Sequence, residues 1–202
     1  MENSEFPNKK RTMEEVSDSS KCLPEELVSP ILSFLPTKEA VARSLSIKKS
    51  WRKHWTFLTT INLNSNDFKE VTFFHQFVDN LLSGIKLENV EKFVLLCNYN
   101  GYEPHDEVVR EWINGVIRKS KKLEYLELHL EQPFELPSLV FSVNTLKVLK
   151  LSGEVSVEPL SHVNLPSLKV LDLKSVRTAS VRRIWGQLLS SRPLVKGALL
   201  EF

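Results

Sequence analysis

The sequence has few of the features on which disulfide-stabilised, secreted or membrane proteins depend. It contains two cysteines among 202 residues, Cys22 and Cys97. Two are too few for a disulfide framework, so a reducing compartment is the default expectation. No apolar run approaches the roughly 18 to 20 residues of a membrane span, and residues 1–21 lack the apolar core of a signal peptide. We therefore expect a protein of the cytoplasm, the nucleus or both, with no membrane partner.

The residue types that build catalytic centres are also scarce or badly spaced. The six glycines are too dispersed for a phosphate-binding loop or a dinucleotide-binding turn. The five histidines and two cysteines show no metal-ligand spacing. Cys97 ends an apolar stretch, so we interpret it as a buried, inert thiol and not as a nucleophile. The sequence thus predicts no catalytic residue, no metal site and no cofactor, and hence a protein that is not an enzyme.

The overall charge is too weak to indicate a polyanionic partner. The formal net charge of +2 argues against nucleic acid or an anionic membrane as the main partner. A hydrophobic content of 42% and a charged content of 26% are ordinary for a soluble globular protein, and the length allows one or two domains with a sizeable core. Residues 1–21 show no apolar periodicity and are rich in Lys, Glu and Ser, so we expect a disordered tail there.

What the sequence does contain is a dense helical segment between residues 23 and 55. Pro24 suits the first position of a helix, and the two glutamates that follow complement the positive end of its dipole. The next apolar residues recur at helical spacing, and Pro36 ends the helix. They are Leu27, Ile31, Leu32 and Leu35. A second amphipathic helix and a basic-aromatic run at 48–55 come next. This segment has more apolar surface than two or three short helices can bury among themselves.

The remainder of the chain alternates between strand and helix patterns. Apolar alternation predicts strands at 57–64 and 90–95. Apolar residues at helical spacing predict helices at 74–85, 106–119 and 180–189.

Three segments in the second half repeat the pattern L-x-x-L-x-L. They begin at Leu123, Leu146 and Leu168, which makes the spacings 23 and 22 residues, within the roughly 20 to 29 residues of leucine-rich repeats. Each unit is a strand with a return segment, and its leucines are buried only against the neighbouring unit, so stacking creates one continuous core. Degenerate copies begin at Val90 and Leu194. We therefore prefer a repeat architecture to a generic α+β domain.

The sequence also resembles a known family. The segments LPEEL at 23–27, ILSFLPTKEAV at 31–41 and WRKHW at 51–55 resemble the F-box of plant F-box/leucine-rich-repeat proteins. The segment FHQFVDNLL at 74–82, the three leucine repeats and the two LPSL segments are similar to the region that follows the F-box in that family. Because the family continues into further repeats, the resemblance implies a short member that lacks the usual C-terminal part.

The resemblance and the repeats together define an expected fold. It is of the α+β repeat class, with an N-terminal three-helix F-box followed by an irregular leucine-rich-repeat solenoid that has a parallel β-sheet on its concave face. We expect a disordered tail at 1–21, the F-box at 22–62 and the leucine-rich-repeat region at 63–202. The clear repeats within that region start at 123, 146 and 168, and the degenerate ones start at 90 and 194.

The family resemblance also implies a function. In the family, the F-box binds a Skp-type adaptor that bridges to a cullin, and the C-terminal part selects the protein to be ubiquitinated. This chain would then be the substrate-recognition subunit of an SCF-type (Skp–cullin–F-box) ubiquitin ligase, with an unknown protein substrate. It would catalyse nothing itself and would act by proximity. The alternative is a truncated paralogue that serves as a non-catalytic scaffold or adaptor decoy without substrate delivery.

Two sets of binding residues follow from these expectations. The resemblance assigns the adaptor face to Leu23, Pro24, Leu27, Ile31, Leu32, Leu35, Pro36, Leu45 and Trp51. Within this set we expect Leu27 and Leu45 to lie partly inside the F-box, and Leu23, Pro24 and Trp51 to point outward. Strand alternation assigns the substrate face to Tyr125, Glu127, His129, Lys150, Asp172 and Lys174. For each residue of the second set, a merely solvated position is the alternative.

Overall fold

The computed structural model describes residues 24–46, 49–98, 106–157, 163–176, 182, 184, 186 and 197–201. The α-helices are α1 (Glu25–Leu32), α2 (Thr37–Ser46), α3 (Val71–Gly84) and α4 (Asp106–Lys119). The 3-10 helices are η2 (Lys49–Phe57), η3 (Ser65–Asp67), η4 (Leu87–Asn89) and η5 (Ser138–Ser142). The strands are β1 (Thr60–Asn64), β2 (Lys92–Cys97), β3 (Tyr125–Leu136), β4 (Val148–Val157), β5 (Val170–Lys174) and β6 (Gly197–Glu201).

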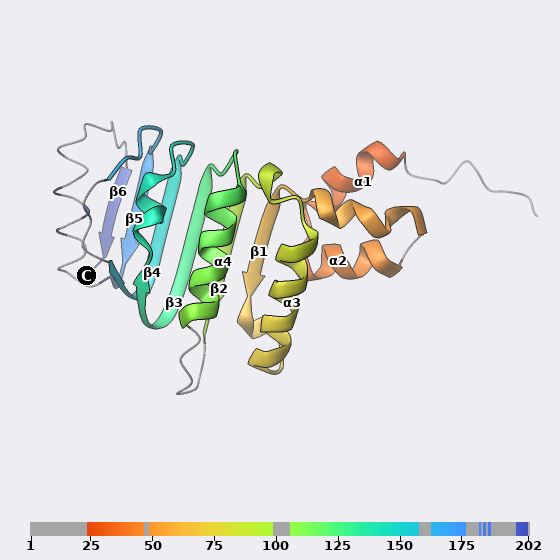
Figure 1. Ribbon diagram of the computed structural model, residues 1–202, viewed down its shortest axis with the longest axis horizontal. Helices are drawn as coiled ribbons and strands as arrows, with labels where there is room; N and C mark the ends of the chain where they lie inside the picture. Colours follow the sequence, from red (N-terminus) through yellow and green to blue (C-terminus); the bar gives the residue numbers. More distant parts are fainter. Residues whose placement is uncertain are drawn as a thin grey trace, which may run out of the picture.

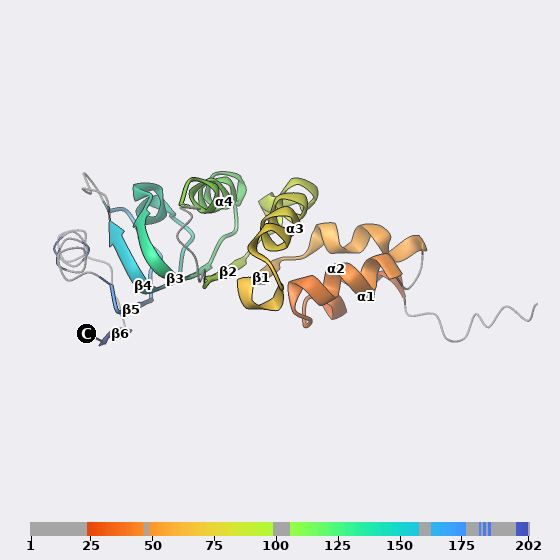
Figure 2. The same cartoon turned by 90° about the horizontal axis from the view of Figure 1, so that it is seen from below.

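The six strands form one sheet in which the spatial order is the order of the sequence. All five neighbouring pairs are parallel, as Figure 1 shows. Parallel neighbours require a crossover connection, and the described connections that contain α3, α4 and η5 return over the same side of the sheet. Figure 2 shows α3 and α4 together on that side, and none of the described helices covers the opposite side of the sheet.

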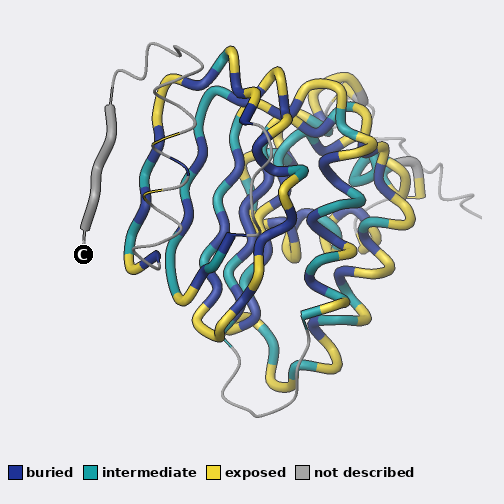
Figure 3. Tube along the Cα trace, turned by 60° about the vertical axis from the view of Figure 1, so that its left-hand side comes forward, coloured by how far each residue is buried: buried dark blue, intermediate teal, exposed yellow. Residues whose placement is uncertain are grey.

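The three predicted leucine segments lie side by side in register, which confirms that part of the repeat prediction. Leu126 is aligned with Leu149, which in turn is aligned with Leu171. Two residues further along, Leu128, Leu151 and Leu173 form a second such row. The side chains of both rows are buried. Figure 3 shows the resulting alternation of buried and less buried positions along the strands. The leucines of each strand are therefore covered by the strands on either side.

The helices complete the covered side of the sheet. The predicted helix at 106–119 is α4, and its apolar stripe is buried at Val109, Ile113 and Val116. The helix predicted at 74–85 is α3, which the structure starts three residues earlier at Val71. The indole N–H of Trp112 in α4 donates to Asp79 Oδ1 of α3 at 2.7 Å. This hydrogen bond joins α3 to α4, as does the contact between the rings of Phe74 and Trp112.

Several predicted boundaries require correction. The first strand begins at Thr60 and not at residue 57, because Phe57 still belongs to η2. The second strand begins at Lys92 and not at residue 90, since Val90 closes a turn with Leu87. The first helix ends at Leu32, where the chain tightens into bonds that span three residues. The predicted tail at 1–21, most of the predicted helix at 180–189 and the repeat start at Leu194 lie outside the described residues.

A bulge interrupts the pairing of β3 with β4 and depends on one glycine. The register of the two strands shifts between Leu130 and Phe134. Opposite Leu130, Gly153 has a φ of +97°, in the region that side-chain-bearing residues rarely adopt. A Cβ at this position would lie 2.0 Å from the backbone oxygen of Leu130. Only glycine fits both the backbone conformation and the available space.

We expect Gly153→Ala to lower the free energy of unfolding by about 2 kcal/mol or more, since the strained φ alone costs on the order of 1 to 3 kcal/mol. Urea denaturation of the full chain, followed by circular dichroism, measures the change. Gly115→Ala is the matched control: a Cβ there meets nothing within 4 Å, and glycine inside a helix is roughly 0.5 to 1 kcal/mol less stable than alanine. Equal effects of the two substitutions would contradict the role assigned to Gly153.

Candidate functional site

The N-terminal helical segments leave an apolar stripe uncovered. Leu27, Ile31 and Phe34 follow one another at spacings of four and three residues along α1 and the turn after it. Their exposed fractions are 48%, 42% and 88%. On the other side of α1, Val28 and Leu32 are fully buried. An isolated exposed leucine is unremarkable, but a helix that is apolar on two opposite sides needs a second surface to cover it. We call Leu27, Ile31 and Phe34 the apolar stripe.

The 3-10 helix η2 holds α1 in place. The ring nitrogen Nδ1 of His54 lies 3.1 Å from Ser29 Oγ of α1. Trp51 and Trp55 of η2 are half-buried and pack against the main core. Gly84 at the end of α3 makes room for Trp55, because a Cβ there would lie 2.3 Å from the indole ring. The inner side of α1 is thus fixed through η2 to the sheet domain, while the apolar stripe remains on the outside.

The burial of the nine predicted adaptor-face residues differs from expectation at several positions. Leu32 is only 1% exposed, so its side chain is an internal packing residue and not a contact surface. Trp51, expected to point outward, packs against the core instead. Leu27 and Leu45, expected to lie partly inside, are 48% and 51% exposed. Val28 and Leu32 occupy the core-facing side of α1, and Trp51 packs against the same core, which leaves Leu27 on the outer side of the helix.

The burial of the other predicted adaptor-face residues neither supports nor opposes a contact role. Pro24 and Pro36 are exposed, Leu35 is half-buried against the core, and Leu23 lies outside the described residues. The sequence reasoning missed Phe34, which is the most exposed large apolar side chain that the structure describes. Its spacing of three residues from Ile31 was a usable signal. The contact of each residue with a partner stays a prediction.

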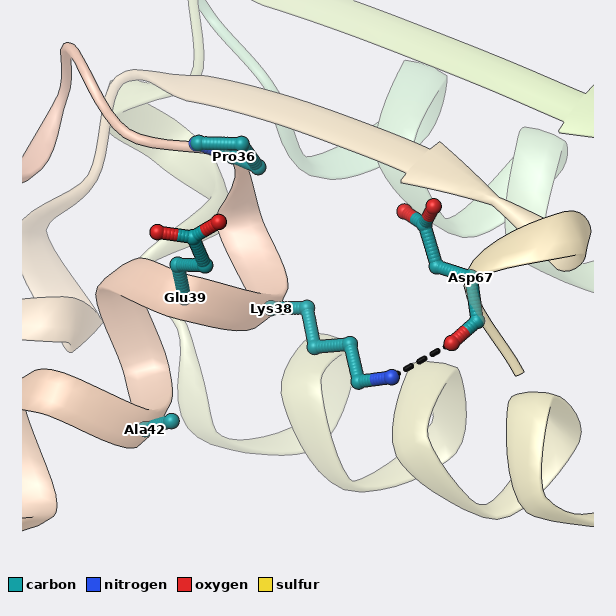
Figure 4. Close-up of a pocket in the computed structure, with 5 residues that line it drawn as sticks. All are labelled: Pro36, Lys38, Glu39, Ala42 and Asp67. Carbon is teal, nitrogen blue, oxygen red and sulfur yellow. Dashed lines mark hydrogen bonds between the residues drawn. The ribbon is translucent and has the colours of Figure 1, made fainter. Parts of the chain in front are cut away.

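A second set of contacts joins the helical segments to the first strand. The backbone N–H of Asn62 in β1 donates to Thr37 Oγ1 at 2.7 Å, and Thr37 is buried. Next to it, Lys38 Nζ donates to the backbone oxygen of Asp67 at 2.5 Å and lies 4.2 Å from the centre of the Phe68 ring. Figure 4 shows Lys38 reaching from α2 toward Asp67. Both residues line a hollow of about 380 Å³. Helix α2 therefore covers the outer edge of β1, which no strand pairs with among the described residues.

The open side of the sheet carries the six predicted substrate-face residues. Glu127, Lys150 and Asp172 are aligned across β3, β4 and β5, and His129, Ser152 and Lys174 form the next row. All six predicted residues are half-buried. Five of the six residues in these rows, all but His129, line a hollow of about 140 Å³. The structure therefore brings five of the predicted residues into two adjacent rows, with Tyr125 next to them at the start of β3.

The polar groups on this face bond mainly to one another. Tyr125 donates its hydroxyl to Glu127 Oε2 at 2.5 Å, and its ring lies under Lys92 and Lys150, whose Nζ atoms are 4.5 and 5.7 Å from its centre. Burial raises the pKa of the Tyr125 hydroxyl, and the bond to Glu127 raises it further. The contact with Tyr125 raises the pKa of Lys150. At neutral pH the phenol thus keeps its proton and the amine its charge, so neither group is activated as a nucleophile.

The remaining observations concern metal ligands, membrane spans and the described cysteine. Across the described ranges, no three His, Cys, Asp or Glu side chains are placed to hold a metal ion. None of the helices that the structure describes is both long and apolar enough to cross a membrane. Cys97 is buried, as the sequence predicted. Among the described residues, the apolar stripe and the open side of the sheet are the candidate binding surfaces.

Comparison with curated proteins found relatives in Arabidopsis thaliana. The F-box protein At4g09920 is 35% identical over 159 residues, which cover 77% of this chain and 49% of that protein. F-box/LRR-repeat protein 13 is 32% identical over 157 residues, with shares of 75% and 34%. The F-box/LRR-repeat protein At4g14103 is 33% identical over 187 residues, with shares of 89% and 48%. The chain spans half or less of the length of these relatives. No family model and no solved structure matches it.

We expect Thr37→Val to lower the free energy of unfolding by about 1 to 3 kcal/mol, because it leaves the partly buried N–H of Asn62 without an acceptor. Hydrogen exchange should speed up at the Asn62 amide in particular. Thr37→Ser is the control, since it keeps the oxygen and loses only a methyl group. If Thr37→Val and Thr37→Ser were equally stable, the hydroxyl would have no part in covering the β1 edge.

Proposed function

Because this chain belongs to the plant F-box/leucine-rich-repeat proteins, we propose that it is a substrate-recognition subunit of an SCF-type ubiquitin ligase. Residues 22–62 form the F-box and bind a Skp-type adaptor, which links them to a cullin. Residues 63–202 form a leucine-rich-repeat solenoid whose open face holds a protein substrate. The protein acts in the cytoplasm, the nucleus or both.

The apolar stripe carries this proposal. It presents two aliphatic side chains and one phenylalanine on a short helix whose opposite side is already packed in the core. An amphipathic helix with anchors at this spacing suits a hydrophobic groove on a partner. Large apolar anchors of this kind dominate the affinity of such interfaces. Ile31 and Phe34 are the residues on which we expect adaptor binding to depend most.

The sheet geometry supports the second half of the proposal. Parallel strands in sequence order, with leucines aligned from strand to strand, are what stacked leucine-rich repeats produce. The open side offers outward residues from three successive strands, at the place where repeat proteins present an extended binding surface. Its charges have both signs, which suits a protein surface better than a ligand of one charge.

The proposed role is non-catalytic. The receptor raises the local concentration of a bound substrate near a conjugating enzyme that other subunits carry. Neither the apolar stripe nor the open face supplies an activated group for a reaction of its own. The rate of ubiquitination is then governed by occupancy and geometry.

We expect Phe34→Glu to weaken binding to a purified Skp-type adaptor by roughly 30-fold or more, the size of a loss of about 2 kcal/mol at an anchor residue. Isothermal titration calorimetry measures the affinity. Phe73→Glu is the matched control. Phe73 is 53% exposed on α3, so this substitution introduces the same charge away from the apolar stripe. Leu32 is unsuitable for this test, because a charge in its buried position would unfold the helix. Adaptor binding that survives Phe34→Glu would refute the proposed docking helix.

A purification experiment separates a substrate receptor from the alternative of a scaffold or adaptor decoy. The full chain should recover adaptor, cullin and at least one protein that accumulates when the proteasome is blocked. Recovery of adaptor and cullin alone would favour the decoy. Recovery of neither would remove the F-box assignment itself.

A further inference from the structure

Three cations on η2 have no acidic partner among the described residues. Lys49, Arg52 and Lys53 are exposed, and none of them forms an ion pair with any residue that the structure describes. In a 3-10 helix, residues three apart lie on one side, so Lys49 and Arg52 share a side of η2 and Lys53 follows directly. We call these three residues the basic cluster. They concentrate a charge of three in a chain whose formal net charge is only +2.

The other two Lys and Arg side chains described between residues 24 and 57 have partners. Lys38 donates to the backbone oxygen of Asp67, and Arg43 lies 3.6 Å from Glu39. Among the described residues of this segment, the positive charge without an acidic partner is therefore that of the basic cluster. Three like charges so close together repel one another, and an opposing acidic surface would relieve that repulsion.

The basic cluster lies on the element that holds the apolar stripe in place. η2 packs against both α1 and α2, and its His54 contacts Ser29 of α1 at 3.1 Å. Trp51 and Trp55 use the inner side of η2 for packing, so the cations face solvent on the outside. Because α1 packs directly on η2, we expect a partner large enough to cover the apolar stripe to extend as far as the exposed side of η2.

We propose that the adaptor surface that docks on this chain is acidic beside its apolar groove, and that the basic cluster steers its approach. This inference rests on the proposed function. Charges at the rim of an interface act mainly on the association rate and its salt dependence, whereas buried anchors determine the dissociation rate. The apolar stripe thus determines how long the complex lasts, and the basic cluster determines how fast it forms.

The test is a kinetic measurement with the full chain and a purified Skp-type adaptor at low and moderate salt. The variant carries Lys49→Glu, Arg52→Glu and Lys53→Glu together. We expect its association rate to fall about tenfold at low salt, as loss of electrostatic steering does, while the dissociation rate stays within about threefold. The difference should shrink as salt rises, because screening shortens the range of the interaction.

The matched control carries Lys119→Glu, Lys121→Glu and Lys122→Glu, three exposed lysines at and after the end of α4. It changes the net charge by the same amount in the sheet half. Slow association of the first variant alone supports the proposal. Equal slowing of both variants would reduce the effect to net charge and overturn it, as would unchanged association of the first variant.

Two further outcomes are informative. Tight binding of the wild-type chain to heparin, lost in the η2 variant, would assign the basic cluster to a polyanion and overturn the proposal. If the wild-type chain fails to bind the adaptor at any salt, the proposed function itself fails. Should the triple glutamate variant unfold by circular dichroism, the Lys49→Gln, Arg52→Gln and Lys53→Gln variant replaces it, with a smaller expected loss in association rate.

Discussion

The structure depends on one constraint: no strand can bury its own leucines, which need both the strands beside it and the helices on the covered side of the sheet. Leu149 sits between Leu126 and Leu171, and no single unit could remove these side chains from water. The first strand of such a stack would have an unpaired edge and apolar side chains exposed to water. Here the helices before β1 provide the cover, through the Thr37 hydroxyl that accepts the Asn62 amide.

The helices before β1 share one hydrophobic core with the sheet, which bears on the proposed function. The buried side chains of α1 and α2, Val28, Leu32 and Ala40, belong to the same core as the leucines of the sheet. Lys38 and the Trp55–Gly84 contact add two further points of attachment. The apolar stripe and the open side of the sheet are thus parts of one packed body. A receptor that acts by proximity needs such a fixed relation, because substrate held at a variable distance loses effective concentration.

The sequence predicted the periodic parts of this fold and missed those that depend on packing. The 22- and 23-residue spacings predicted parallel strands in register, since each repeat must present its leucines at the same height. The exchange of Leu32 for Phe34 as an exposed residue shows the limit. Phe34 lies three residues after Ile31 and shares its side of the helix, whereas Leu32 directly follows Ile31 and faces the core. The 3-10 form of 49–57 and the bulge at Gly153 likewise follow from tertiary contacts that no local pattern encodes.

The two candidate surfaces differ in the interactions that their side chains already make within the molecule. Docking on the apolar stripe breaks no hydrogen bond of these side chains. Each Å² of apolar surface that is removed from water contributes roughly 25 cal/mol of favourable free energy. On the open side of the sheet, Tyr125 already donates to Glu127, and His129 lies 2.6 Å from Ser152. A substrate that contacts these groups must replace existing hydrogen bonds, so the net gain per contact is small. Asp172 Oδ1 on the same face is the exception, because it is buried and has no hydrogen-bond partner among the described residues. Under the proposed function, the molecule would hold its adaptor firmly and exchange its substrates readily, as repeated delivery by one receptor requires.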